Sequence, residues 1–317
     1  MLSAEKLAPD LASIVQCPKC SAHLFTTLCE QCGESYPVVA GQPVLIDFDQ
    51  SIFDRAFYEH GGGYSDAPRL SRTVGARLQR TLMGENVTAK PCIELLLARV
   101  RANSSTPRIL VIGGGTVGSD SEALYAAPDV TVVGTDIYAS PATVLIADGH
   151  SLPFRDETFD GVVVQAVLEH VLNPWQVVAE IHRVLRPGGV VYADTPFMQQ
   201  VHMGAYDFTR FTLSGHRWLF RHFEEIASGS SAGVGTSTIW SVRYLLRALG
   251  WPSRMVNAAG LTLFFLKRAD RAKHRQANAD GASGVYFVGE KSDTPIGAKD
   301  MVSYYERQAT PSPIDAG

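Results

Sequence analysis

The sequence predicts an α/β fold built around a mostly parallel sheet. Two β-rich runs support this prediction, and the first contains a continuous apolar stretch at 109–112, as in a strand that is covered on both faces. The first run, residues 108–112, leads directly into a glycine-rich stretch at 113–118, and the second, residues 130–136, ends in Asp136. Glycines let a backbone approach a ligand closely, and an acid at this distance can hold ribose hydroxyls.

Later segments continue the alternation of strand and helix patterns. Asn173 and Pro174 are typical of a helix start, and Arg186-Pro-Gly-Gly is expected to stop that helix before the next strand. Residues 137–143 are too few for the helix that usually links parallel strands, so we predict a loop there. The remaining predicted elements are helices at 53–58, 93–100, 212–222 and 240–249 and strands at 159–164, 190–194, 223–227 and 284–289.

The C-terminal half contains three segments whose structure is predicted from features other than strand and helix alternation. The helix at 240–249 is expected to turn its apolar face inward. Residues 261–266 fit a strand, but the basic run at 267–275 favours the end of a helix. The tail after Lys291 is polar and contains proline, so we expect it to be loosely held.

Three further motifs carry a family resemblance. They are Ala-Asp-Gly-His-Ser-Leu-Pro-Phe at 147–154, the run at 159–171 that ends in Leu-Glu-His-Val, and Val-Leu-Arg-Pro-Gly-Gly-Val-Val-Tyr at 184–192. With the glycine loop, and in this order and spacing, they make residues 106–290 resemble class I S-adenosylmethionine (SAM) dependent methyltransferases. The resemblance implies a Rossmann-like core of seven strands.

The resemblance also implies which residues bind SAM. In the family the glycine loop lies under the methionine part, the acid after the second strand holds the ribose, and the acid after the third strand meets the adenine amino group. Val111 stands where the family usually has an acid, and Val117 where it has a third glycine, so contacts beyond the first three glycines stay open. The SAM-binding residues expected here are Gly113, Gly114, Gly115, Asp136, Ile137, Asp148, Gly149, His150 and Gln165.

Four of the five cysteines lie in one short segment, as Cys17-Pro-Lys-Cys20 and Cys29-Glu-Gln-Cys32. Two such pairs can converge tetrahedrally on a zinc ion. The alternatives are disulfides or a coincidence, and a chain without a secretion signal disfavours disulfides. Four thiolates leave no open position on the ion, so we expect a structural zinc, although the segment can also dock a substrate or a partner.

Residues 17–46 resemble the small zinc-ribbon protein that activates several RNA and protein methyltransferases, including its Tyr-Pro and Gly-x-Pro-Val-Leu elements. So short a segment cannot bury a useful core, and metal binding would supply its folding energy. The predicted organisation is a zinc ribbon at 1–50, a linker with pre-core helices at 51–105, a methyltransferase core at 106–290 and a tail at 291–317.

The loop after the fifth core strand is dense in polar side chains. It resembles the Pro-Phe…His…Tyr-Asp-Phe-x-Arg-Phe-Thr signature of methyltransferases from sugar, lipid and specialised-metabolite pathways. Because ligands bind beyond the carboxyl ends of such strands, we expect His202, Asp207 and Arg210 near the acceptor. His202 is the best candidate base, with Asp207 orienting it or serving instead, and His170 is the next candidate. The alternative is a structural loop in which Asp207 and Arg210 pair with each other.

Composition restricts the class of protein. The chain has 317 residues, 45% of them hydrophobic, and a formal net charge of −4. The acidic balance disfavours nucleic acid as a substrate but leaves it open. No apolar run reaches the roughly 18 residues of a membrane span. The N-terminus has no apolar signal core, so a cytoplasmic location is expected.

These observations predict a SAM-dependent methyltransferase with a structural zinc ribbon, acting on an oxygen or nitrogen of a small-molecule, lipid or glycan-type acceptor. One alternative is a ribosomal or transfer RNA base methyltransferase, since certain ribosomal RNA enzymes also carry an N-terminal zinc ribbon. The lack of a Lys/Arg-rich stripe in residues 1–60 argues against it. Another is a non-catalytic module that binds SAM or a partner. The oligomeric state stays open, a homodimer included.

Overall fold

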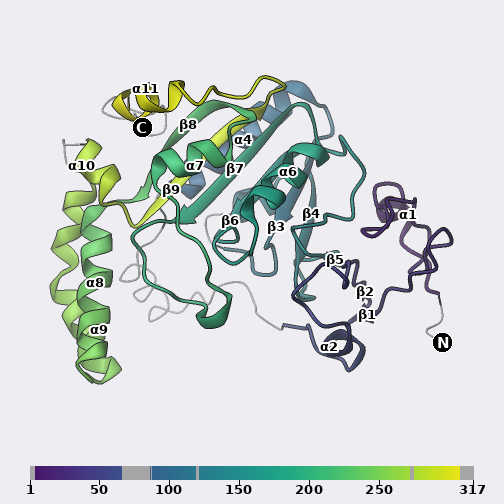
Figure 1. Ribbon diagram of the computed structural model, residues 1–317, viewed down its shortest axis with the longest axis horizontal. Coiled ribbons are helices and arrows are strands. Elements are labelled where there is room, and N and C mark those ends of the chain that lie inside the picture. The colour runs from purple at the N-terminus through teal and green to yellow at the C-terminus, as the bar shows by residue number, and fades with distance from the viewer. Residues whose placement is uncertain (1–3, 66–85, 87, 119–120, 272–274, 308–317) are drawn as a thin grey trace. The chain divides into compact units, whose positions relative to one another are not determined.

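The computed structural model describes residues 4–65, 86, 88–118, 121–271 and 275–307 (Figure 1). The chain divides into two compact units, and each is built from segments that are separated in the sequence. The first unit comprises Met1–Leu70, Ala98–Val164 and Asn173–Val190, and the second comprises Ser71–Leu97, Gln165–Leu172 and Val191–Gly317.

Seven of the described strands form one sheet in the order β5-β4-β3-β6-β7-β9-β8. β3 pairs in parallel with β4 and β6, β4 pairs in parallel with β5, and β8 and β9 are antiparallel. The predicted seven-stranded α/β fold is therefore confirmed. The strands of this sheet are β3 (Arg108–Ile112), β4 (Thr131–Asp136), β5 (Leu145–Ile146), β6 (Phe159–Gln165), β7 (Leu185–Pro196), β8 (Phe223–Ala232) and β9 (Gly284–Lys291), and β1 (Val38–Val39) and β2 (Gln42–Pro43) form a separate hairpin.

The helices differ widely in length, and within the described ranges none is both long and apolar enough to cross a membrane. In chain order they are α1 (Pro9–Ala12), α2 (Arg55–Glu59), α4 (Ala89–Asn103), α5 (Glu122–Tyr125), α6 (Pro174–Val184), η1 (Gly204–Tyr206), α7 (Leu213–Leu219), α8 (Val234–Ala248), α9 (Ser253–Thr262), η2 (Phe264–Arg271), α10 (Arg275–Asp280) and α11 (Asp300–Arg307).

β3 and β6 form the centre of the first unit. Residues 109–112 and 159–164 are all buried, as expected for strands that are covered on both faces of a sheet. The chain proceeds outward from β3 through β4 to β5 and then returns to place β6 on the other side of β3. The switch in strand order therefore lies between β3 and β6, where ligands bind at the carboxyl ends of the strands in folds of this kind.

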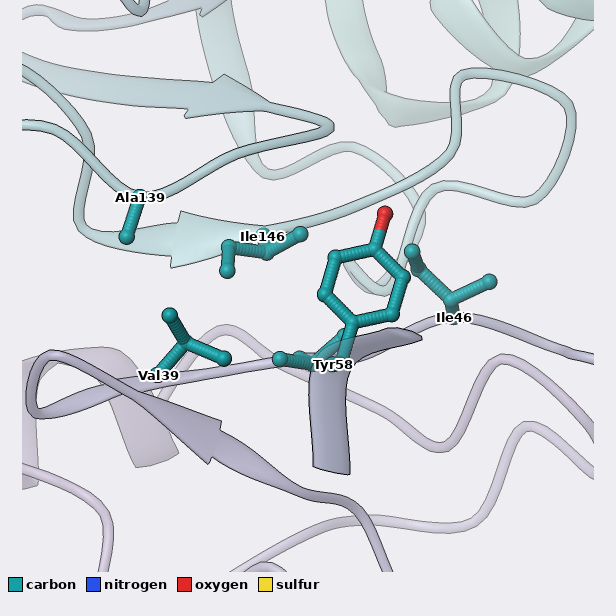
Figure 2. Packing of buried hydrophobic residues seen from close by; sticks show 6 residues of the cluster. Val39, Ile46, Tyr58, Ala139 and Ile146 are labelled. Carbon is teal, nitrogen blue, oxygen red and sulfur yellow. The ribbon is translucent and has the colours of Figure 1, made fainter. Parts of the chain in front are cut away.

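The cysteine segment, residues 17–46, contacts the β5 edge of this sheet. Val44 forms a parallel bridge with Ile146, and the N–H of Leu45 donates to the Ile146 carbonyl at 2.8 Å. A buried apolar cluster lies beside the bridge (Figure 2). Its members are Val39, Val44, Ile46, Tyr58, Ala139 and Ile146. The segment thus forms a single bridge with the last strand of the sheet and shares an apolar core with it.

Most elements predicted for the first unit lie close to where they were expected. Residues 137–143 contain no helix, as predicted. The side chain of Asn173 accepts a hydrogen bond from the Gln176 N–H and caps α6, which begins at Pro174. The following strand differs from the prediction. β7 begins at Leu185, directly after α6, so the Arg-Pro-Gly-Gly stretch belongs to the strand instead of preceding it.

In the second unit, the expectation of a loosely held tail is wrong for residues 300–307. They form α11, and Tyr304 on this helix is 3% exposed. Tyr304 belongs to a buried cluster with Leu213, Ala279 and Val285, and its hydroxyl lies 3.0 Å from the Ser228 hydroxyl. These contacts fix the helix. Residues 308–317 lie outside the described residues.

The segment after β8 is helical, and residues 261–266 form no strand, as predicted. The inward apolar face expected for α8 is only partly right. Ile239 is buried, and so is Arg243, which donates to the Asn257 side chain of α9 at 3.0 Å. Leu245 and Leu249 are instead 58% and 66% exposed. Within the predicted basic run, residues 272–274 lie outside the described residues.

Candidate functional site

The glycine loop after β3 is in direct contact with the acid at the end of β4. Gly113 has a φ of +73°, which is a left-handed conformation that favours glycine. A Cβ on Gly115 would lie 2.4 Å from the ring of Tyr138 and 2.7 Å from the carboxylate of Asp136. The Gly115 N–H donates to Asp136 Oδ2 at 2.9 Å. The structure therefore brings together two sequence-predicted SAM-binding elements that are far apart in the chain.

The carboxylate of Asp136 is well placed to accept further hydrogen bonds. It accepts the N–H of Gly115 and, at 2.7 Å, the N–H of Ile137. An ionised carboxylate offers about four acceptor positions, so capacity remains for a pair of ribose hydroxyls. Burial raises the pKa of Asp136 to about 6. The nearby Tyr125 hydroxyl, which the sequence did not single out, is buried and has no partner within the described chain.

Asp148 follows β5 and is tied to two other residues. Its Oδ1 accepts the backbone N–H of His150 at 3.0 Å and lies 2.6 Å from Nδ1 of the same residue. Its Oδ2 accepts the Ser51 hydroxyl at 2.5 Å. Burial alone would raise the pKa of Asp148, but the hydrogen bonds from His150 and Ser51 hold it below its usual value. His150 Nε2 accepts the N–H of Asn173 at 3.1 Å, so the ring carries its hydrogen on Nδ1.

Ser51 is a residue that the sequence did not indicate, because a single serine in a predicted linker has no distinguishing pattern. Gly149 is close-packed, and a Cβ there would lie 3.3 Å from Val177 of α6. Gln165, also predicted to bind SAM, belongs to the second unit, where its amide donates to the Tyr192 hydroxyl at 3.1 Å.

The four cysteines predicted to bind zinc converge. Cys17 Sγ lies 3.7 Å from Cys32 Sγ, Cys20 Sγ lies 3.6 Å from Cys29 Sγ, and all four sulfur atoms are within 4.8 Å of one another. None of the four forms a disulfide. Sulfur atoms on a tetrahedral zinc ion, with bonds of about 2.3 Å, are about 3.8 Å apart. The donor set and its spacing therefore fit a zinc ion.

The loop after β7 orders its polar residues around Asp207. Arg210 forms a two-pronged ion pair with this carboxylate, with its Nη2 2.8 Å from Oδ2. The hydrogen bond from Arg210 holds the pKa of Asp207 well below its usual range. The backbone N–H of His202 donates to Asp207 Oδ2 at 2.9 Å, and its ring Nδ1 lies 3.4 Å from that oxygen. Asp207 and Arg210 thus do pair with each other, but Asp207 also contacts both the backbone and the ring of His202.

His170 and Glu169, which follow β6, lie beside His202. The rings of His170 and His202 are 4.9 Å apart at their centroids, with an angle of 75° between their planes. Oε1 of Glu169 lies 3.6 Å from His170 Nε2 and 3.9 Å from His202 Nε2. Burial lowers the pKa of His170. The structure therefore brings the two predicted base candidates together and adds a buried acid to them.

Two acids of the second unit were not predicted as site residues. Burial raises the pKa of Glu169 to about 8 and that of Asp194 to about 7. Asp194 lies in β7 and accepts a hydrogen bond from the Asn86 side chain at 3.0 Å. Their position along the chain could have indicated both. Glu169 follows β6 and Asp194 lies in the C-terminal part of β7, and ligands bind at the carboxyl ends of such strands.

The family model of the methyltransferase domain matches residues 110–193. An uncharacterized methyltransferase of Mycobacterium tuberculosis (strain ATCC 25177 / H37Ra) is 34% identical over 133 residues, which are 39% of this chain and 52% of that protein. A demethylmenaquinone methyltransferase of Symbiobacterium thermophilum is 29% identical over 147 residues, 40% of this chain and 55% of that protein. The chain spans about half the length of the curated relatives it matches.

Among solved structures, the phosphoethanolamine N-methyltransferase 2 of Haemonchus contortus in complex with S-adenosyl-L-methionine has a TM-score of 0.44 and 15% identity, over 79% of this chain and 62% of that chain. The family match includes the end of the glycine loop's strand, the loop itself, Asp136 and Asp148. Residues 110–193 of this chain therefore match the methyltransferase domain family.

Proposed function

We propose that the protein is a SAM-dependent methyltransferase whose acceptor is an oxygen or nitrogen of a small-molecule, lipid or glycan-type compound. The contact between Gly115 and Asp136, inside the region that matches the methyltransferase domain, carries this proposal. Asp136 would accept the ribose hydroxyls and Asp148 the adenine amino group. A small-molecule acceptor is supported by the similarity to a demethylmenaquinone methyltransferase.

Methyl transfer from a sulfonium is a direct displacement, so the protein must align the acceptor atom, the methyl carbon and the sulfur. Such alignment can lower the barrier by roughly 7–11 kcal/mol. A hydroxyl or ammonium acceptor must also lose a proton. We assign this proton to Nε2 of His202, with Asp207 orienting the ring from Nδ1 and His170 as the second candidate base. The four cysteines would hold a structural zinc ion.

Cofactor binding is the first test. Calorimetry with the purified protein is expected to give binding of SAM and S-adenosylhomocysteine but not of NAD. Asp136→Ala should raise the Kd for SAM about ten- to a hundredfold, because hydrogen bonds to a charged group contribute about 1.5–3 kcal/mol. Asp129→Ala is the matched control, since this acid pairs with Arg101 at the surface. Tight binding of NAD without binding of SAM would contradict the proposed function.

The affinity for S-adenosylhomocysteine should also depend on pH. Asp136 has a pKa of about 6 in the free protein, and the ribose hydroxyls favour its ionised form, so binding releases a proton as pH falls through this value. Affinity should be constant above about pH 7 and fall about tenfold per pH unit below 6. Asp136→Asn should bind more weakly and lose this dependence. A wild-type affinity that stays flat between pH 5 and 7 would remove the carboxylate from the ribose contact.

The class of acceptor can be tested without knowing its identity. Methyl-labelled SAM is incubated with the protein and with separated fractions of a cell extract that contain small molecules, lipids, glycans or RNA. Label is expected in one of the first three fractions. Label in RNA would overturn the acceptor class, and a protein that binds SAM but labels no fraction would be a non-catalytic module.

A further inference from the structure

The side chain of Glu169 is 1% exposed, and neither of its carboxylate oxygens has a hydrogen-bond partner within the described chain. Buried polar atoms are nearly always paired, so this carboxylate requires an explanation. The backbone at this residue is held in place, because the Glu169 carbonyl accepts the Phe208 N–H at 2.8 Å. The nitrogen atoms that approach Oε1 are Nε2 of His170 at 3.6 Å and Nε2 of His202 at 3.9 Å.

The other nitrogen of each ring is occupied by an outer partner. Nδ1 of His170 lies 2.6 Å from the carbonyl oxygen of Tyr206, so it must be the donor in this hydrogen bond. Nδ1 of His202 faces Oδ2 of Asp207 at 3.4 Å. With hydrogens on both Nδ1 atoms, each Nε2 directs a lone pair toward the same carboxylate oxygen. Three electron-pair donors then converge on one point, and a cation placed between them would satisfy all three.

We propose that Glu169, His170 and His202 bind a divalent transition-metal ion, through one carboxylate oxygen and the two Nε2 atoms. The three ligand atoms lie within 4.8 Å of one another. Ligands at about 2.0–2.2 Å from a shared ion are about 3.0–3.5 Å apart, so small side-chain rotations close the site. Histidine ligands typically donate their second ring hydrogen to a carbonyl or a carboxylate, which is the arrangement around both rings here.

This donor set differs in kind from the four cysteines. Two imidazoles and a carboxylate suit Mn²⁺, Fe²⁺, Co²⁺ or Zn²⁺ and leave coordination positions open, whereas four thiolates select zinc and close its coordination sphere. The role of the ion rests on the proposed function. A Lewis acid lowers the pKa of an acceptor hydroxyl. The O–H bond then breaks with loss of the proton to solvent, and the new O–CH₃ bond forms as the C–S bond of SAM breaks. His202 would then be a ligand and not the base.

The test measures metal binding directly, without SAM or an acceptor. Mn²⁺ is titrated into the full-length protein with zinc already bound, and free Mn²⁺ is followed by electron paramagnetic resonance. Mn²⁺ prefers oxygen and nitrogen ligands and does not compete for four thiolates. One Mn²⁺ per chain is expected. Glu169→Gln, which keeps the size of the side chain, should abolish this binding, and Asp207→Asn should weaken it about 10–100-fold as the loss of an outer partner.

The matched control is Val201→Ala, in the same loop, because this side chain is 54% exposed and takes no part in the cluster. It should bind Mn²⁺ as the wild type does. Melting temperatures show whether Glu169→Gln is folded, and His170→Ala serves as a second ligand variant. Co²⁺ distinguishes the two sites, because an ion on the cluster lacks the thiolate charge-transfer absorption of an ion on the cysteines.

Wild-type protein that binds Mn²⁺ and Co²⁺ no better than folded Glu169→Gln would overturn the inference and leave a cluster held by a shared proton. Other outcomes test the proposed function separately from the metal site. Binding that depends on Glu169 in a protein that methylates no acceptor would keep the metal site and remove its catalytic role. Methyl transfer that persists in Glu169→Gln would keep the proposed function and remove the ion from the reaction.

Discussion

Replacing His202 by alanine is expected to lower the turnover number for methyl transfer by about 10²–10⁴-fold, the usual contribution of a positioned base. The affinity for SAM should change little, because the described contacts of His202 are with Glu169, Asp207 and the ring of His170. A residue that acts on the acceptor during the reaction lowers kcat more than it weakens cofactor binding. Steady-state kinetics, calorimetry with SAM and melting temperatures measure the three quantities.

Val201→Ala is again the control, since it alters the neighbouring position without touching the cluster. A loss of turnover in both variants would indicate a general disturbance of the loop. Normal turnover in His202→Ala would contradict the assignment and move it to His170, whose ring lies 4.9 Å away. Turnover is expected to fall in His202→Ala whether His202 acts as a base or as a metal ligand. The Mn²⁺ titration distinguishes these two roles.

Replacing Cys17 by serine is expected to remove the zinc ion from the cysteines and to unfold the cysteine segment. The segment is too short for a core of its own, and structural zinc contributes an apparent 10–16 kcal/mol in zinc-finger peptides, about as much as their entire folding free energy. The zinc content measured by elemental analysis should fall from about one ion per chain to almost none. Limited proteolysis should show new cleavage between residues 17 and 46.

The comparison is made in a Glu169→Gln background, so that an ion on the histidine cluster does not contribute to the zinc count. Cys92→Ala is the matched control, because this buried cysteine lies on α4 and outside the group of four. It should retain its zinc. A Glu169→Gln protein without zinc, or a Cys17→Ser variant that resists the protease as well as this parent does, would show that the segment stays folded without a metal ion.

The features that could be predicted from the sequence are those that depend on residues close to one another in the chain. The contact between the glycine loop and Asp136 could be predicted because the carboxyl ends of parallel strands meet at one edge of a sheet. The choice of Asp148 came from the family resemblance. The cap at Asn173 is similarly local, since its partner is three residues away at Gln176. The α/β fold followed from the alternation of strand and helix patterns, and its seven strands were implied by the family resemblance.

What the sequence did not predict depends on long-range contacts. Tyr304 fixes α11 through residues of α7, α10 and β9, and nothing within the tail itself indicates these partners. Ser51 becomes relevant only because it reaches Asp148, 97 positions later in the chain. Glu169 was visible in the Leu-Glu-His motif, but its burial and lack of partners are properties of the folded chain. The residues next to Glu169 in the sequence do not show whether its side chain serves packing or chemistry.

The bridge between Val44 and Ile146 has a consequence for the solubility of the protein. β5 is the last strand of the sheet on this side, and an uncovered last strand offers unpaired N–H and C=O groups to the strands of other molecules. Here the Leu45 N–H occupies the Ile146 carbonyl, and the apolar side chains beside it are covered. A chain whose cysteine segment unfolds would therefore expose the unpaired edge of β5 and self-associate. The supply of the proposed zinc ion would then determine how much of the protein stays in solution.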